Sequence, residues 1–225
     1  MMKPAGKIEP LVNHHKGLTA YVFGTGKSLD AFDFDEVGDG VQICLNCTMG
    51  VVPVLRGRTY WMVLDDAWRL KVPGPWDIWL DELRSHNGVV GVFMKPMYGP
   101  DGERTEPPPG PHVIHFRSPR SKHAYELLTK TRGQIGRLNT LFTYAGTGCT
   151  AVHLAWLMGA ARVVIVGIDG SDGYADRVIQ WYDKPKRGGF GYGMSKECTL
   201  DAAGRLGIEL VDFSERANSE DVQGL

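Results

Sequence analysis

The chain has 225 residues, of which 43% are hydrophobic and 23% charged, and a formal net charge of −1. This length favours one large α/β domain over two domains, each of which would be small. The near-zero charge excludes a strong electrostatic field that would draw the whole protein onto nucleic acid or an anionic membrane. No apolar run approaches the ~18 residues of a transmembrane helix, and no signal-peptide pattern is evident, so we expect a cytoplasmic protein.

Four cysteines are present: Cys44, Cys47, Cys149 and Cys198. They are too few for a disulfide framework in a chain of this length. Cys44 and Cys47 have the CxxC spacing, but Cys44 lies in an apolar run that predicts a buried strand. No second Cys/His pair follows at ligand spacing, so we expect structural cysteines and no metal site here.

The first half of the chain predicts five strands. Residues 1–17 are expected to form a loose N-terminal arm, with His14 and His15 in a solvated loop, and the main domain spans residues 18–213 before a tail at 214–225. Apolar runs rich in strand formers occur at 18–23, 41–45, 59–64 and 89–94, and an alternating run at 112–116 predicts an edge strand. Helical spacing marks residues 76–86, and six prolines make residues 95–111 a long loop.

The second half of the chain carries the clearest helix and strand patterns. Residues 147–158 predict a helix that Gly159 ends, and 162–168 form an almost wholly apolar strand. A helix at 195–206, with Ser195 as its N-cap, precedes a last strand at 208–213. Continuous apolar strands are typical of sheets that helices cover on both faces. The fold class is therefore a single-domain, Rossmann-like α/β fold with a mostly parallel sheet and helices on both faces.

Small and polar residues follow most of the predicted strands. Ligands of open parallel sheets bind outside the carboxyl ends of the strands, so these residues are candidates for one common site. The candidates are Gly24, Thr25, Gly26 and Ser28 after the first strand, Asn46 and Thr48 after the second, Asp65 and Asp66 after the third, and Asp169, Ser171 and Asp172 after the strand at 162–168. The turn at residues 146–148 leads into the predicted helix that precedes the strand at 162–168, and it adds further small and polar residues.

The loop at residues 24–29 has the sequence Gly-Thr-Gly-Lys-Ser-Leu. It is not a Walker A loop, because Tyr21 occupies the position of the first glycine, and Leu29 replaces the third glycine of a Rossmann fingerprint. Its glycines nevertheless permit a tight turn and a close approach of a ligand to the backbone. The following amides, together with Ser28, could hold a phosphate, although a plain glycine turn is the alternative.

Two blocks of the sequence resemble a known family. The blocks are residues 24–29, 45–46 and 63–65 in the first half, and 147–148, 155, 159, 163–169, 174–175 and 193–196 in the second half. They are similar to the G-x-G-P-S-L, S-G, G-I-D, S-Y-A and G-H-S-K segments of bacterial CMP-sialic-acid-dependent sialyltransferases of the Campylobacter type. The outer blocks also resemble a broader set that contains motility accessory factor glycosyltransferases and an archaeal 6-hydroxymethylpterin pyrophosphokinase. Residues 70–140 match neither.

The resemblance implies a set of nucleotide contacts. They fall on Gly24, Thr25, Gly26, Ser28, Asn46, Asp65, Thr147, Gly148 and Asp169, and the family's phosphate-binding tyrosine falls on Tyr174. Lys27 replaces the usual proline of the loop and adds a positive charge beside any phosphate. The family's catalytic histidine falls on Met194, whose thioether cannot accept a proton at neutral pH.

These patterns predict a glycosyltransferase-like enzyme that binds a nucleotide-activated sugar, most readily a CMP-sugar, and an acceptor that the sequence does not identify. The general base is open among Asp66, His153 and Asp172, although a packed histidine is the alternative for His153. No cofactor is required, but Asp65 and Asp66 could hold Mg²⁺ on a nucleotide. An ATP- and Mg²⁺-dependent pyrophosphokinase or nucleotidyl-transfer enzyme and a non-catalytic nucleotide-binding protein are the alternatives. Residues 181–190 could form a lid over the site or a solvated loop.

Overall fold

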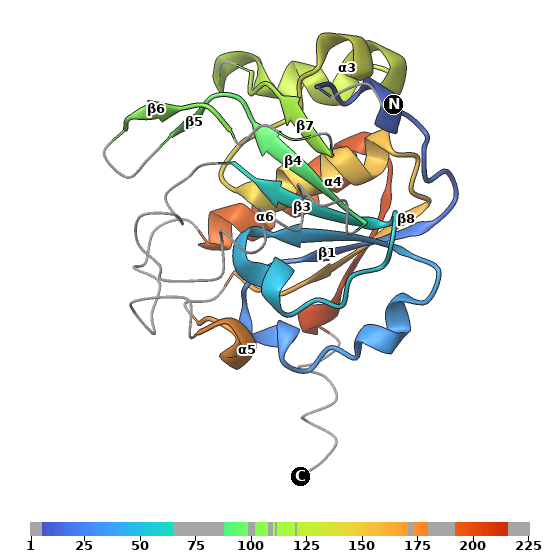
Figure 1. Cartoon of the computed structure of the whole chain (residues 1–225), viewed down its shortest axis with the longest axis vertical. Helices are drawn as coiled ribbons and strands as arrows, with labels where there is room; N and C mark the ends of the chain where they lie inside the picture. Colours follow the sequence, from blue (N-terminus) through green and yellow to red (C-terminus); the bar gives the residue numbers. More distant parts are fainter. Residues whose placement is uncertain are drawn as a thin grey trace.

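The computed structural model describes residues 6–64, 88–98, 102–107, 110, 112–119, 121–170, 173–179 and 192–215. Seven strands form one sheet in the order β7-β4-β3-β2-β1-β8-β9, and every neighbouring pair is parallel (Figure 1). Their bounds are β1 Thr19–Phe23, β2 Val41–Leu45, β3 Thr59–Val63, β4 Val89–Met94, β7 Val113–Phe116, β8 Arg162–Val166 and β9 Glu209–Asp212. The predicted Rossmann-like α/β fold and the edge strand near residues 112–116 are confirmed.

The strand order reverses between β1 and β8. The chain runs outward from β1 through β2, β3 and β4 to β7, and then returns to add β8 and β9 on the other side of β1. Ala20 of β1 therefore lies opposite Val41 of β2 on one side and Val163 of β8 on the other. Such a reversal is the position where loops of open α/β sheets separate and ligands bind.

The strands are apolar on both faces because two layers cover the sheet. Along β1, Ala20 and Val22 pack into one core, whereas Tyr21 and Phe23 pack into the other. The first core is closed by α3 (Arg132–Leu138), α4 (Thr147–Leu157) and α6 (Tyr192–Leu206), with a 3₁₀ helix, η5 (Ser121–Thr129). The second is closed by the short segments η2 (Lys27–Leu29), η3 (Phe34–Val37), η4 (Asn46–Gly50) and α5 (Asp176–Ile179).

The N-terminal segment is not the loose arm that its composition predicted. Ile8, in front of the 3₁₀ helix η1 (Glu9–Leu11), is fully buried, and the amide of Asn13 donates to the Leu157 carbonyl at 3.0 Å. His15 is also buried, with its Nε2 atom 2.6 Å from the Tyr60 hydroxyl. Burial lowers the pKa of His15 to about 4, so the neutral ring forms this contact at neutral pH. The segment packs through a few apolar side chains, such as Ile8 and Leu11, and its mostly polar composition gave no sign of this packing.

Several element boundaries also differ from the predictions. The Pro-rich loop contains a two-stranded antiparallel hairpin, β5 (Met97–Tyr98) with β6 (Arg104–Thr105), which projects from the sheet beyond β4 (Figure 1). Helix α6 begins at Tyr192, so Ser195 lies inside the helix and is not its N-cap. The predicted helix at residues 76–86 lies outside the described residues. Among the described residues, no helix is long and apolar enough to cross a membrane.

Candidate functional site

The loops after β1 and β8 meet at the reversal of the strand order. The Gly24 amide donates to the Val166 carbonyl at 2.7 Å, and the Gly26 amide donates to the Gly167 carbonyl at 2.8 Å. A Cβ atom on Gly24 would collide with the Gly167 carbonyl oxygen, and one on Gly167, which has a φ of 71°, would collide with the Gly24 carbonyl. Gly24 and Gly167 therefore let two backbones touch, whereas the sequence had suggested that the loop glycines, Gly24 and Gly26, make room for a ligand.

Ser28 and Asp169 close the crevice between the two loops. The Ser28 amide donates to Asp169 Oδ2 at 2.8 Å, and the Ser28 hydroxyl donates to Asp169 Oδ1. The same hydroxyl accepts a hydrogen bond from the Gly167 amide at 2.8 Å. The prediction that Asp169 lies close to the loop is confirmed. Both residues use their polar atoms on each other, so in this conformation they position the loop and do not face a ligand.

The glycine loop is consequently a poor phosphate cradle. The amides of Gly24, Gly26 and Ser28 all donate within the protein, and the Thr25 side chain is buried. A phosphate needs amides that point into open space. In this conformation these three amides do not fit the expectation that the loop holds a phosphate directly, because β8 and the residues after it already accept their hydrogen bonds.

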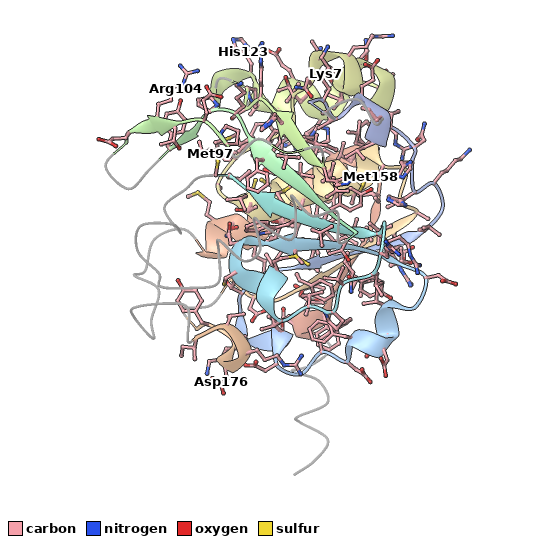
Figure 2. All side chains as sticks on the ribbon, viewed as in Figure 1. Lys7, Met97, Arg104, His123, Met158 and Asp176 are labelled. Atoms are coloured by element: carbon pink, nitrogen blue, oxygen red, sulfur yellow. The ribbon has the colours of Figure 1, made fainter. Side chains whose placement is uncertain are left out.

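The N-terminus of α4 lies at the same edge of the sheet, and its N-cap residue makes no side-chain cap hydrogen bond among the described residues. Helix α4 precedes β8 and runs antiparallel to the strands. Figure 2 accordingly shows Met158, at its C-terminal end, across the molecule from Met97 and Arg104, which follow the carboxyl end of β4. Gly146 is the N-cap and forms no side-chain cap. Because α4 runs antiparallel to the strands, its first turn, with the half-buried Thr147 at the first helical position, and the positive end of its dipole lie at the edge where ligands of such sheets bind.

Ile168 connects the two parts of the candidate site. A Cβ atom on Gly24 would lie 2.8 Å from the Ile168 side chain, and one on Gly148 would lie 3.1 Å from the same side chain. The predicted proximity of Gly148 to the glycine loop is therefore confirmed. The Cβ of Gly148 would also lie 2.7 Å from Thr199 Oγ1 of α6, so this glycine is needed for helix packing. A valine here would disrupt that packing, whatever its effect on a ligand.

Lys27 and Tyr174 lie beside the glycine loop. The Ala175 amide donates to the Thr25 carbonyl at 2.9 Å and fixes the segment that carries Tyr174, which is half-buried against the second core. The Lys27 stem passes over Gly173, where an added Cβ would lie 2.7 Å from Lys27 Cε. The Lys27 side chain is exposed, and no ion pair with its ammonium group occurs within the described part of the chain. It is an exposed positive charge at this edge of the sheet.

Asn46 lies at the carboxyl end of β2, one strand away from the reversal. Its backbone has a φ of 53°, a left-handed conformation that asparagine tolerates, and its carbonyl accepts a hydrogen bond from Trp61 Nε1 at 2.7 Å. The next turn is fixed by Thr48, whose hydroxyl lies 3.0 Å from the Phe23 carbonyl and 3.0 Å from the Leu45 carbonyl. The half-buried Asn46 is thus held at the carboxyl edge of the sheet, the edge at which the sequence predicted a nucleotide site.

His153 is a packed core residue and cannot serve as the general base. It is fully buried, its ring stacks on Trp156, and its Nδ1 accepts a hydrogen bond from the Phe142 amide at 2.7 Å. Burial lowers the pKa of His153 to about 3, so the ring is neutral at physiological pH. The side chain does not reach the site although it lies about one turn beyond the start of α4, because it packs on Trp156 and bonds to Phe142 in the segment before the helix.

Two residues near the N-terminus of α6, Met194 and Lys196, differ in their exposure and their contacts. Met194, which the resemblance aligns with a catalytic histidine, is 49% exposed. Lys196 extends from α6 past Gly170 to Asp212 at the end of β9, where its Nζ lies 2.6 Å from Oδ2. Ser214 Oγ is 3.1 Å from the same nitrogen. The sequence assigned no role to Lys196, and only the structure shows that it ties α6 to the ends of β8 and β9.

Four candidate side chains lie outside the described residues: Asp65, Asp66, Ser171 and Asp172. The same holds for the predicted lid at 181–190. Within the described ranges, no group of three or more His, Cys, Asp or Glu side chains is arranged to hold a metal ion. The Mg²⁺ site predicted at Asp65 and Asp66 is therefore still a prediction.

Comparison of the chain with protein-family models, with curated protein sequences and with solved structures finds no match. The function must therefore be inferred from the site itself.

Proposed function

We propose that this protein binds the phosphate of a nucleotide-activated sugar, most readily a CMP-sugar, at the N-terminus of α4 and transfers the sugar to an acceptor. The observation that carries the proposal is the helix end without a side-chain cap beside the β1–β8 reversal, with Gly146 in front of it and the exposed Lys27 nearby. A helix N-terminus attracts a phosphate through its unpaired amides and its dipole, and a lysine adds a full charge.

The proposed chemistry is a direct displacement at the anomeric carbon. The acceptor oxygen forms a bond to that carbon while the bond to the nucleotide phosphate oxygen breaks. The leaving phosphate gains charge during this step, and the amides of Thr147 and Gly148, together with Lys27 and Tyr174, would stabilise it. The acceptor proton must pass to a base. The candidates that remain are Asp66 and Asp172, since His153 is buried and neutral.

A matched pair of variants tests the position of the phosphate. Thr147→Asp places a carboxylate at the first turn of α4, where negative charge stabilises a helix, so the fold should be retained. The same carboxylate repels a phosphate bound at this helix end, and we expect CMP affinity to fall at least about tenfold. Thr147→Asn has a similar size and no charge, so its affinity should stay close to that of the wild type.

The measurement is a thermal-shift panel of CMP, CTP, UDP, GDP and ATP, with and without Mg²⁺, on the wild type and both variants. Ligand at ~100 times its Kd stabilises a protein by about 2.7 kcal/mol, which gives a clear shift. Stabilisation by CMP without metal, lost in Thr147→Asp and kept in Thr147→Asn, supports the proposal. Stabilisation by ATP alone and only with Mg²⁺ would replace it with a pyrophosphokinase, and CMP binding without turnover of any CMP-sugar would reduce it to a nucleotide-binding protein.

A further inference from the structure

Two cysteines face each other across the contact between α4 and α6. Cys149 lies in the first turn of α4 and Cys198 in the second turn of α6, and both are buried and reduced. Cys149 Sγ is 2.7 Å from the Tyr144 carbonyl oxygen, and Cys198 Sγ is 3.2 Å from the same oxygen. Because both sulfur atoms contact one oxygen, the two thiols belong to the same small cluster between the helices. A disulfide between them requires a shift that brings the sulfur atoms into bonding distance.

The helices pack closely beside the two cysteines. Gly148 precedes Cys149, Thr199 follows Cys198, and a Cβ atom on Gly148 would lie 2.7 Å from Thr199 Oγ1. Because glycine has no side chain, the α4 backbone lies directly against the Thr199 side chain, and the helices run nearer than two larger residues would allow. The other two cysteines, Cys44 of β2 and Cys47 of η4, lie in the second core, on the other face of the sheet from α4 and α6.

We propose that Cys149 and Cys198 are a redox modification site, at which a peroxide oxidises the two thiols to a disulfide that links α4 to α6. Cys149 attacks one peroxide oxygen, the O–O bond breaks, and the leaving hydroxide takes a proton to become water. Cys149 is then a sulfenic acid. Cys198 attacks its sulfur, the S–S bond forms, the S–O bond breaks, and a second water leaves with the Cys198 proton. Two thiols and one hydrogen peroxide thus give one disulfide and two waters.

Cys149 is the better nucleophile of the pair. The neighbouring Cys198 thiol lowers the pKa of the Cys149 thiol, and the position in the first turn of a helix favours a thiolate further. The interaction with Cys149 and burial raise the pKa of Cys198, so it is suited to the resolving step. A small oxidant such as hydrogen peroxide is required, because Cys149 is only 1% exposed and Cys198 only 6%.

The disulfide would remove hydrogen bonds that hold the turn at residues 144–146, in front of α4. The thiols now hold the carbonyl of Tyr144, and Cys149 Sγ also lies 3.1 Å from the carbonyl of Gly146. Ala145 and Gly146 between them have φ values of 54° and 152°, so this turn depends on its tethers. Oxidation removes both S–H donors and should loosen the helix end. We expect CMP affinity to fall about tenfold, an inference that rests on the proposed function.

The test is to expose the reduced full-length protein to graded hydrogen peroxide, block the remaining thiols and map tryptic peptides by mass spectrometry. Cleavage gives one peptide with Cys149 (residues 138–162) and one with Cys198 (residues 197–205), and we expect them as a linked, reductant-sensitive pair. Cys149→Ser and Cys198→Ser should each abolish the pair, whereas Cys44→Ala should keep it. Circular dichroism and thermal unfolding establish that each variant is folded.

Alkylation of both thiols after peroxide treatment, with no linked pair in the folded wild type, would overturn the modification site. CMP titration of the reduced and oxidised protein is read separately. If the reduced protein binds no nucleotide, the proposed function fails while a mapped disulfide stands. If it binds CMP equally well in both states, the coupling of the disulfide to α4 is wrong.

Discussion

Replacing Ser28 with alanine should destabilise the whole domain, because its hydroxyl joins the two loops at the β1–β8 reversal. The hydroxyl donates to the Asp169 carboxylate and accepts from the Gly167 amide at 2.8 Å. A hydrogen bond to a charged group contributes about 1.5–3 kcal/mol, and a buried amide left without a partner costs about 1–3 kcal/mol. Relaxation of the loop recovers part of this, so we expect Ser28→Ala to lower the free energy of unfolding by about 2–4 kcal/mol.

Urea denaturation at equilibrium measures this loss, and thermal unfolding should show a decrease in Tm of roughly 5–15 °C for a chain of this size. The control is Lys27→Ala on the same loop. Its side chain is exposed, so the free energy of unfolding should change by no more than about 0.5 kcal/mol. A Ser28→Ala protein as stable as the Lys27→Ala protein would refute the view that this hydroxyl closes the crevice.

Two further substitutions test other parts of the structure. Gly24→Ala should destabilise the protein by about 1–3 kcal/mol or prevent folding, since its Cβ meets the Gly167 carbonyl, whereas Gly133→Ala in α3, with open space around it, should be neutral or stabilising in the same urea titration. His153→Asn keeps an acceptor for the Phe142 amide but cannot titrate. The pKa of His153 is about 3 when folded and 6.5 when unfolded, so the wild type loses stability as pH falls through this interval. At about pH 4.5 the His153 contribution to this loss is about 2–3 kcal/mol, and a variant with the same pH dependence as the wild type would contradict the assignment.

The sheet could be predicted because its signals are local. Strands such as Arg162–Val166 are apolar on both faces, and only a sheet covered on both sides buries such a run. The N-terminal segment could not be predicted in this way. It is held by Ile8 and by the pairing of His15 with Tyr60, and a contact over 45 residues leaves no periodic trace in a sequence.

One missed helix did carry a readable signal. Thr131 and Gln134 form a capping box at the start of α3, with the Gln134 amide bonded to the Thr131 hydroxyl at 3.3 Å. The spacing of a threonine and a glutamine three residues later is typical of a helix start. The pattern is short, and the Pro-rich stretch before it gave no apolar periodicity to support it, so the helix was not predicted.

The candidate site shows where residue type is ambiguous. Glycines at 24 and 26 are compatible with a ligand or with another backbone, and only the position of Gly167 decides between them. Ser28 and Asp169 were predicted to meet at one edge of the sheet, and they do. Whether these polar groups bind each other or a ligand depends on the distance between the Ser28 hydroxyl and the Asp169 carboxylate. No sequence pattern specifies that distance.

The most direct test of the proposed site is a titration of the isotope-labelled protein with CMP, followed by amide chemical shifts. We predict saturable changes that are largest at Thr147 and Gly148, with smaller changes at Lys27 and the glycine loop, and their loss in Thr147→Asp but not in Thr147→Asn. Amide shifts that do not respond to CMP, or that respond only at the opposite edge of the sheet around Met158, would contradict the account.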